Sequence, residues 1–157
     1  MAERKILVDS NVYFRLAKSI HPLLGRTFGR ESYCLYVIKQ LQTEYDNNPR
    51  LRNVFPWVNE ASYVNNRSHR LPVTRDENIQ IQRAFEFIHD YVRNVHPGVS
   101  RVDVLCLAHA EVLGIPVVTD DADMIEAARD YEIKVCKTLD LLKLMLDSGY
   151  IEIAKIK

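Results

Sequence analysis

The chain is poor in the residues that mark secreted, membrane-spanning or linker-rich proteins. Its 157 residues include three cysteines, five glycines and six prolines, with no Pro- or Gly-rich linker and no internal repeat. Cys34, Cys106 and Cys136 lie far apart in apolar stretches and form no CxxC pair, so we expect small core residues in a reducing compartment. No apolar run approaches about 18 residues, and the N-terminus has no signal-peptide core, which together predict a cytoplasmic protein that does not enter the membrane.

Several sequence motifs of enzyme sites are also absent. The sequence has no GxxxxGK[ST], GxGxxG or GxSxG motif, which argues against nucleoside-triphosphate, dinucleotide and serine-hydrolase chemistry. The histidines show no metal-binding spacing such as HExxH. Any metal site in this chain is therefore expected to use oxygen ligands.

The net charge is zero and predicts no partner, but the charges are unevenly distributed. Residues 1–75 carry 12 Lys and Arg against 6 Asp and Glu, a net +6, and residues 76–157 carry 9 against 15, a net −6. If both halves line one cleft, an acidic floor faces basic walls, which suits a polyanion held over a metal ion. Ordinary solvated helix surfaces would give the same division.

Alternating strand and helix patterns predict one α/β domain over residues 1–157, a three-layer αβα sandwich with a central, mostly parallel sheet. The 47% hydrophobic content is sufficient for one core. Strands are expected at 5–8, 33–38, 115–119 and 133–136, with a further edge strand at 150–153. Helices are expected at 11–24, 39–46, 74–95, 100–113, 123–130 and 138–147. Residues 49–73 show helical spacing that Pro56 interrupts.

Acidic residues follow the first and the third of these strands. Asp9 comes directly after the apolar run Ile6–Val8, and Asp120, Asp121 and Asp123 follow the run Ile115–Val118. At about 4 Å and an effective dielectric constant of about 20, each pair of like charges costs roughly 4 kcal/mol. Because ligands of parallel α/β sheets bind outside the carboxyl ends of the strands, we expect Asp9 and Asp121 to face one cleft.

Each acid also has an ordinary structural explanation. Asp9 is a good helix N-cap residue, and Asp103 would close a reciprocal cap with Ser100. One of the three acids at 120–123 is expected to cap the helix that follows them. Glu44 has no local feature that separates it from a solvated charge.

The segments ILVDSN, SRVDVLCLAHAEVLGIPVVTDDADM and IKVCKTLDLLKLMLDSGYI together resemble a PIN domain, and most of all the VapC-like toxin ribonucleases of toxin–antitoxin pairs. The resemblance covers the first strand and the last sixty residues, and it covers residues 20–98 poorly. It implies a PIN-like fold and metal-dependent hydrolysis of RNA, and it places the family's acids at Asp9, Asp103 and Asp121, with Glu44 as the candidate for the fourth.

The resemblance further implies a Mg²⁺ or Mn²⁺ cofactor, which agrees with a ligand set of hard carboxylate oxygens. Asp9, Asp103 and Asp121 would hold the metal and Glu44 would orient the attacking water. Four further residues are candidates for a supporting role: Asn11, Thr119, Asp120 and Asp123. A basic run is a candidate for contacts to RNA phosphates, with a solvated loop as the equal alternative: Arg67, His69, Arg70 and Arg75.

Three other classes of protein are weighed against this interpretation. A haloacid-dehalogenase-type phosphatase would have a second Asp where this chain has Asn11, and a phospho-receiver domain would have an Asp at the end of a central strand and an early acid pair. The third alternative is a catalytically weak PIN-like module that binds RNA or protein. The resemblance also implies an antitoxin partner, and the apolar faces of the first two helices are candidates for a homodimer contact.

Overall fold

The computed structural model describes residues 3–150, and they form an α/β fold around one parallel sheet. The strands are β1 (Arg4–Val8), β2 (Tyr33–Tyr36), β3 (Val117–Val118) and β4 (Val135–Cys136). All neighbours are parallel and the order is β2-β1-β3-β4. This arrangement brings β1 and β3 side by side although more than a hundred residues separate them in the chain.

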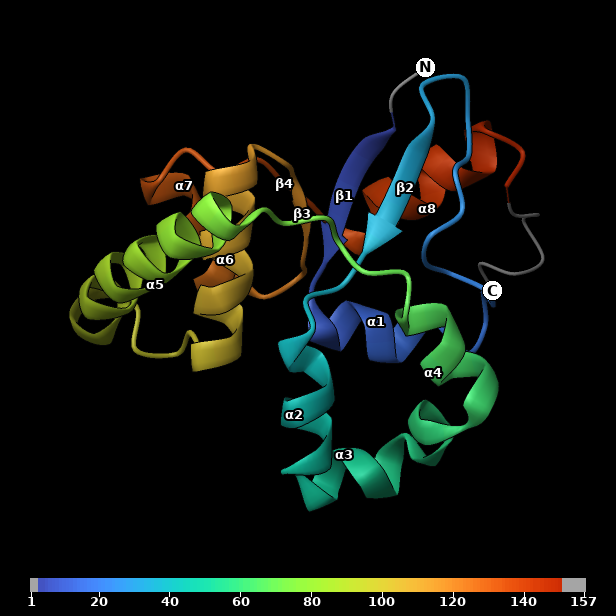
Figure 1. Ribbon diagram of the computed structural model, residues 1–157, viewed down its shortest axis with the longest axis horizontal. Coiled ribbons are helices and arrows are strands. Elements are labelled where there is room, and N and C mark those ends of the chain that lie inside the picture. The colour runs from blue at the N-terminus through green and yellow to red at the C-terminus, as the bar shows by residue number, and fades with distance from the viewer. Residues whose placement is uncertain (1–2, 151–157) are drawn as a thin grey trace.

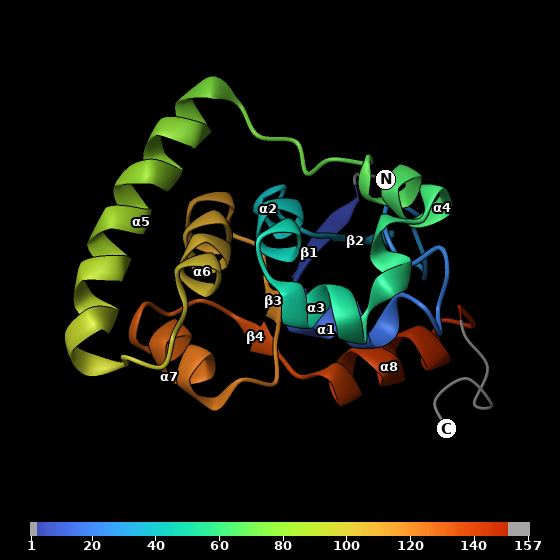
Figure 2. The same cartoon turned by 90° about the horizontal axis from the view of Figure 1, so that it is seen from below.

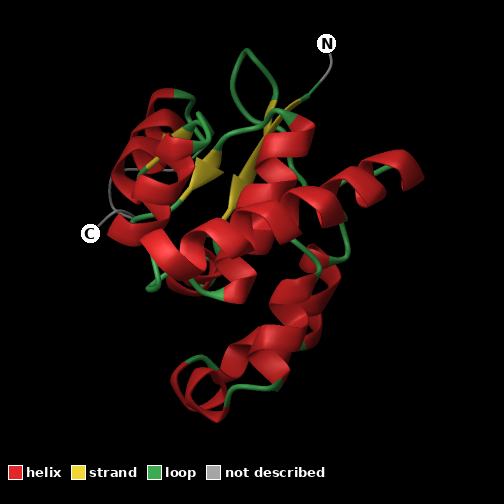
Figure 3. Ribbon diagram, turned by 90° about the vertical axis from the view of Figure 1, so that its left-hand side faces the viewer, coloured by secondary structure: helices red, strands yellow, loops and turns green. Residues whose placement is uncertain are grey.

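Helices cover both faces of the sheet, as the predicted three-layer sandwich requires (Figures 1 and 3). In β1, Ile6 and Val8 face a core shared with α1 (Ser10–Leu16) and α8 (Thr138–Asp147). Leu7 faces the opposite core, shared with α5 (Arg75–Val95), α6 (Arg101–Leu113) and α7 (Ala122–Asp130). This alternation follows from the two-residue period of a strand, which turns successive side chains to opposite faces.

Three short helices and a 3-10 turn follow the carboxyl end of β2 (Figures 1 and 2). They are α2 (Gln40–Asp46), α3 (Pro49–Val54), η1 (Pro56–Asn59) and α4 (Ala61–Arg67). Pro49 and Pro56 each stand near the start of an element, where a missing backbone N–H costs nothing. The helical spacing predicted for residues 49–73 is thus divided among several short pieces.

The predicted helix boundaries agree with the structure where strong capping residues stand. Thr74 and Glu77 form a reciprocal cap at the start of α5, and Gly114 ends α6 with a φ of 65°. The expected helix 11–24 is wrong in its second half, because α1 ends at Leu16. Pro22 lacks a donor and disfavours a helical residue before it, so the chain continues irregularly while Leu23 and Leu24 remain buried.

The expected strands at 115–119 and 133–136 are shorter than predicted, since the ladder pairs only Val117–Val118 with Val135–Cys136. Of the predicted edge strand, residues 151–153 lie outside the described residues. Cys34 and Cys106 are buried thiols as expected, while Cys136 is partly exposed. Within residues 3–150, no helix has both the length and the apolar character that a membrane span needs.

Candidate active site

The first candidate side chain stands where β1 ends. Asp9 follows Val8 directly, and only 2% of it is exposed. It occupies the N-cap position of α1, but its side chain accepts no hydrogen bond from the first turn of that helix. Asp9 thus stands where a helix cap was expected, but its side chain does not cap α1. A buried carboxyl group without a capping partner is costly unless another group compensates it.

Thr119 connects Asp9 to the end of β3. The threonine is fully buried, and its hydroxyl donates to Asp9 Oδ2 at 3.1 Å. The same hydroxyl accepts the backbone N–H of Asp121 at 3.2 Å. One side chain thus uses its donor and an acceptor position to hold the ends of two adjacent strands in register. Of the four supporting candidates, Thr119 is the one that bonds directly to Asp9.

Asp103 lies in the first turn of α6 and has two partners. Its Oδ2 accepts from the backbone of Ser100 at 3.3 Å, and Ser100 Oγ accepts from its backbone N–H at 3.1 Å, so the predicted reciprocal cap is present. The Asp103 carboxyl group also hydrogen-bonds Asp9. Burial raises the pKa of Asp103, the negative charge of Asp121 adds to the rise, and the hydrogen bonds from Ser100 oppose it. Asp103 therefore both caps α6 and interacts with neighbouring acids.

Asp121 is the residue that caps α7. Its Oδ1 accepts the backbone N–H of Met124 at 2.9 Å, which satisfies a free donor of the first turn. The negative charge of Asp121 raises the pKa of Asp103, so the two carboxyl groups are near enough to repel each other. The prediction that one acid at 120–123 caps this helix is confirmed.

Glu44 reaches the other acids from α2. Its Oε2 is buried and has no hydrogen-bond partner among the described residues. Burial raises the pKa of Glu44, the Ser10 hydroxyl lowers it by donating a hydrogen bond, and the charge of Asp103 raises it further. The structure thus places Glu44 beside Asp9 and Asp103, although nothing in its sequence neighbourhood distinguished it from a surface acid.

These four side chains, from here on the carboxylate cluster, are Asp9, Glu44, Asp103 and Asp121. Burial, the charge of Asp103 and to a smaller degree that of Glu44 raise the pKa of Asp9 from 3.8 to about 7, against the hydrogen bond from Thr119. The side-chain interaction between Asp9 and Asp103 raises the pKa of Asp9 further and lowers that of Asp103. The cluster therefore carries less negative charge at neutral pH than four free acids would.

Within the described residues, two of the supporting candidates form no hydrogen bond with the carboxylate cluster. Asp120 accepts from Thr138 N at 2.8 Å and from Thr138 Oγ1 at 2.6 Å, and its Oδ2 lies 3.4 Å from Arg15. Burial acts to raise the pKa of Asp120, but these hydrogen bonds and the positive charges of Arg15 and Lys137 bring it below its usual range. Asp120 therefore has a structural role, which is to accept hydrogen bonds at the start of α8. Asn11 is exposed and has no hydrogen bond from its side chain within residues 3–150.

The remaining supporting candidate, Asp123, is exposed at the start of α7. Its carboxyl group lies against the backbone of Gly98, where an added Cβ would stand 2.1 Å from Asp123 Oδ2. Gly98 is in the segment that leads into α6. Asp123 therefore contacts the loop that precedes α6, the helix that carries Asp103. Within the described residues it makes no hydrogen bond to the carboxylate cluster.

The predicted basic run is divided by the fold. Arg67 is half-buried, donates to the Tyr13 hydroxyl at 2.9 Å and to Gln42 Oε1 at 2.7 Å, and is thereby fixed inside the protein. Arg67 is therefore not part of a solvated loop. His69 packs on Gly25, while Arg70 and Arg75 are exposed and form no ion pair within residues 3–150.

As they stand, no three His, Cys, Asp or Glu side chains of residues 3–150 are spaced to hold one metal ion. The donor chemistry of the carboxylate cluster nevertheless fits a hard divalent cation. Glu44 Oε2 is buried and accepts no hydrogen bond from the described residues, and the Asp9 carboxyl group accepts none from the first turn of α1. Oxygen ligands without His or Cys suit Mg²⁺ or Mn²⁺, and a bound cation would offset the negative charge of these carboxylates.

The sequence patterns missed three residues beside these sites. Ser10 donates to Glu44, and Lys39 and His109 line a cavity next to α2. Lys39 follows β2 closely, so the rule that ligands bind at the carboxyl ends of strands had the information to indicate it. His109 had no such signal, because its place depends on how α6 packs against α2.

The sequence matches no known protein-family model and no curated protein sequence. Among solved structures, the fold is similar to the crystal structure of FitAcB from Neisseria gonorrhoeae, with a TM-score of 0.48 and 17% identity, over 83% of this chain and 95% of that one. Likeness at this level says nothing about activity.

Proposed function

We propose that the protein is a metal-dependent endoribonuclease. The observation that carries the proposal is that Asp9, buried and free of any capping bond, interacts with the charges of Asp103 and Glu44. Asp103 in turn interacts with Asp121, so four acids from separate segments are linked by mutual repulsion. Such a grouping costs stability, which points to a ligand or a reaction as its purpose. The PIN-like order of the motifs supports RNA as the substrate.

In this proposal Asp9, Asp103 and Asp121 would hold Mg²⁺ or Mn²⁺. Once bound, the ion would acidify a water molecule and offset charge on the phosphate. Thr119 keeps the Asp9 carboxyl group in one orientation through the 3.1 Å hydrogen bond. Glu44, with a buried oxygen that has no partner, accepts a proton from the attacking water and orients it.

The test is cleavage of a mixed tRNA and rRNA pool by wild type and by Asp9→Asn, with Mg²⁺ or Mn²⁺ and with EDTA. Because Asn keeps the shape of Asp but not its charge, we expect cleavage to fall by at least about 100-fold while the fold persists. Asp147→Asn serves as the matched control, since Asp147 is exposed in the last turn of α8. Equal cleavage by wild type and Asp9→Asn would contradict the proposal, and RNA binding without cleavage would favour the binding module.

The resemblance to VapC-like proteins extends the proposal to a toxin that a partner antitoxin neutralises. We expect induced expression of wild type to arrest growth and Asp9→Asn to leave growth normal. Coexpression of the product of an adjacent gene is expected to restore growth. Growth arrest by both variants would separate toxicity from the carboxylate cluster.

A homodimer through the apolar faces of the first two helices is not supported. Those faces are already buried in the core of a single chain, with Val12 and Phe14 of α1 and Leu41 and Tyr45 of α2 each exposed by 2% or less. Any self-association must use other surfaces.

A further inference from the structure

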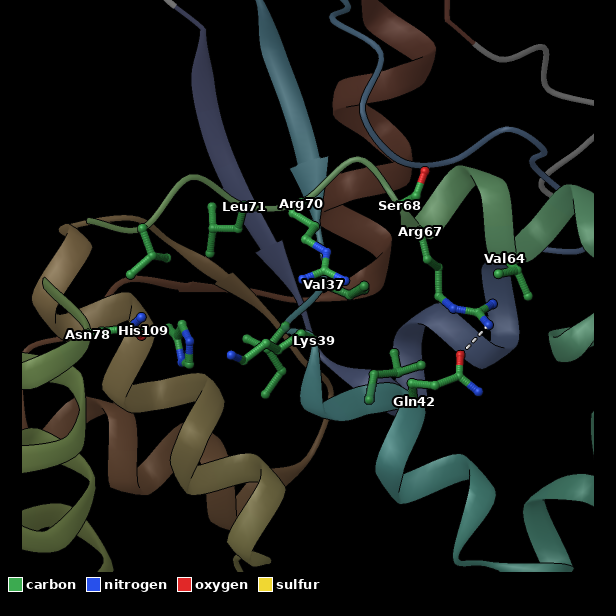
Figure 4. A pocket seen from close by; sticks show the side chains of 13 residues that line it. Val37, Lys39, Gln42, Val64, Arg67, Ser68, Arg70, Leu71, Asn78 and His109 are labelled. Atoms are coloured by element: carbon green, nitrogen blue, oxygen red, sulfur yellow. Dashed lines mark hydrogen bonds between the residues drawn. The ribbon is translucent and has the colours of Figure 1, made fainter. Parts of the chain in front are cut away.

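A cavity of about 420 Å³ lies between the segment that follows β2 and helices α2, α4, α5 and α6 (Figure 4). This volume is within the range of about 300–1,000 Å³ that is usual for ligand pockets. Helices α2 and α6 also carry Glu44 and Asp103, so the cavity and the carboxylate cluster share two helices. The sequence patterns did not predict a pocket here.

The cavity is basic. Lys39, Arg67 and Arg70 line it, and no Asp or Glu is among its lining residues. Arg67 is held by Gln42 at one end, while the ammonium group of Lys39 points toward His109 at the other, with Arg70 between them (Figure 4). Lys39 and Arg70 form no ion pair with any residue from 3 to 150, so their charges are available to an anion.

His109 offers an acceptor beside these cations. Its Nδ1 lies 2.7 Å from the carbonyl oxygen of Leu105, and because a carbonyl only accepts, Nδ1 carries the hydrogen. Nε2 is thereby left as an acceptor while the ring is neutral, and burial lowers the pKa of His109, which favours the neutral form. Only 6% of the residue is exposed, and its ring lines the cavity (Figure 4).

The walls of the cavity between these polar groups are apolar. Val37, Leu71 and Val73 contribute them, and each is partly buried. An apolar cleft with a few polar groups and an anion-binding rim matches a nucleotide, which combines a flat base, an edge with donors and acceptors, and a phosphate.

The cavity is also within reach of the carboxylate cluster. Asp103 and His109 are six residues apart on α6, which is about 9 Å along a helix axis. Glu44 and Gln42 are two residues apart on α2 and serve the cluster and the cavity respectively. A short single-stranded segment therefore spans both places.

We propose that this cavity binds one unpaired nucleotide of the RNA near the cleaved bond, with its base between the apolar walls and its phosphate at Lys39 and Arg70. His109 reads the edge of the base. The inference rests on the proposed ribonuclease function and adds the means by which that function selects its substrate. A base paired in a helix cannot enter such a cavity, so the RNA must be single-stranded there.

The test measures binding without cleavage, with the Asp9→Asn protein in EDTA and fluorescein-labelled 2′-O-methyl oligonucleotides of each of the four bases. Lys39→Ala and Arg70→Ala are each expected to weaken binding about five- to tenfold and to reduce the slope of log affinity against log salt by about 0.7. Lys143→Ala, on the exposed surface of α8, removes the same charge outside the cavity and is expected to have no such effect.

A second variant tests the reading of the base. His109→Gln is expected to change the ratio of affinities among the four oligonucleotides and to leave the salt slope unchanged, because it removes no charge. Because His109 is buried, thermal melting checks that the variant still folds. If it does not, the variants of the exposed residues Lys39 and Arg70 still test the proposal.

Equal binding by the Lys39, Arg70 and Lys143 variants would overturn the cavity proposal, as would failure of every oligonucleotide to bind. The result for the ribonuclease is independent. If wild type cleaves RNA but the cavity variants bind normally, only the cavity proposal fails. If the cavity variants lose binding but wild type never cleaves, the proposed activity fails and the nucleotide site remains.

Discussion

Burial of the Asp9 carboxyl group beside Asp103 makes the stability of the metal-free protein depend on pH. The pKa of Asp9 rises from 3.8 to about 7, so the folded state binds this proton more tightly than the unfolded chain. The resulting stabilisation is complete below the ordinary pKa of an aspartic acid and is lost as pH rises through the pKa in the folded state. At pH 8 the ionised Asp9 is therefore a net cost.

Asp9→Asn is expected to remove this dependence. The amide keeps an oxygen that accepts from Thr119 and offers an N–H to Asp103, and it does not titrate. In EDTA at pH 8 the variant should be more stable than wild type by on the order of 2 kcal/mol, with little difference at pH 4. Urea denaturation at both pH values measures it, with Asp147→Asn as control. A variant less stable than wild type at pH 8 would contradict the pKa assigned to Asp9.

At the scale of single residues, the positions of some side chains could be predicted from the sequence and those of others could not. Asp9, Asp103 and Asp121 were predictable because each sits at a strand end or in a first helical turn, where the backbone sets the direction of the side chain. The direction of Asp120 was not predictable, because it depends on the position of Thr138, eighteen residues later.

At the scale of elements, capping decides where the helices begin. Asp120 accepts the backbone N–H of Thr138, the first residue of α8, and Asp121 accepts that of Met124 in α7. Two adjacent acids thus start two different helices, and only Asp121 also belongs to the carboxylate cluster.

Asp120→Ala is expected to destabilise the protein by about 1 kcal/mol, the usual cost of losing such a bond at a helix start, and to leave RNA cleavage unchanged. Asp120→Asn retains an acceptor and should cost less. Chemical denaturation and the RNA cleavage assay, performed on both variants, measure the two effects. Loss of cleavage in a stable Asp120→Ala protein would instead place this residue in the active site.

Helix boundaries set by neighbouring residues were predicted from the sequence, and the end of α1 was not. The helices expected at 74–95 and 100–113 begin and end within one residue of those bounds, because the caps at Thr74 and Ser100 and the left-handed Gly114 depend on neighbouring residues. The end of α1 at Leu16 was missed, although Pro22 argued against a helix continuing to residue 24. The apolar residues after Leu16 are buried although their backbone is not helical. Their hydrophobic pattern therefore did not indicate a helix.

At the scale of the whole molecule, the fold concentrates charge in places that the charge of the two halves did not indicate. Asp9 and Glu44 of the carboxylate cluster come from the basic half of the chain, and Asp103 and Asp121 from the acidic half. The basic cavity beside them takes Lys39, Arg67 and Arg70 from the basic half and His109 from the acidic half. The predicted acidic floor and basic walls are therefore mixed between the halves.

Convergence of four acids also predicts that a divalent cation stabilises the folded chain. At pH 8, Mg²⁺ or Mn²⁺ at about 100 times its dissociation constant should add about 2.7 kcal/mol. Each kcal/mol corresponds to about 2–4 °C in Tm for a chain of this size. The measurement is thermal melting with and without the cation at equal ionic strength, with Asp147→Asn as control, and Asp9→Asn is expected to lose most of the rise. An equal rise in all three proteins would indicate nonspecific ion effects.

The sequence alone determined the class of fold, the main capping sites and the three acids next to strand ends or helix starts. These features depend on backbone geometry and on residues within a few positions of one another. Tertiary structure alone decided that Glu44 comes close enough to Asp9 and Asp103 for their charges to interact. It also decided that Asp120 and Arg67 form hydrogen bonds inside the fold, and that Lys39 and His109 border one cavity. The physical reason is that these roles depend on how α2, α4, α6 and α8 pack around the sheet, and such long-range contacts leave no periodic signal along the chain.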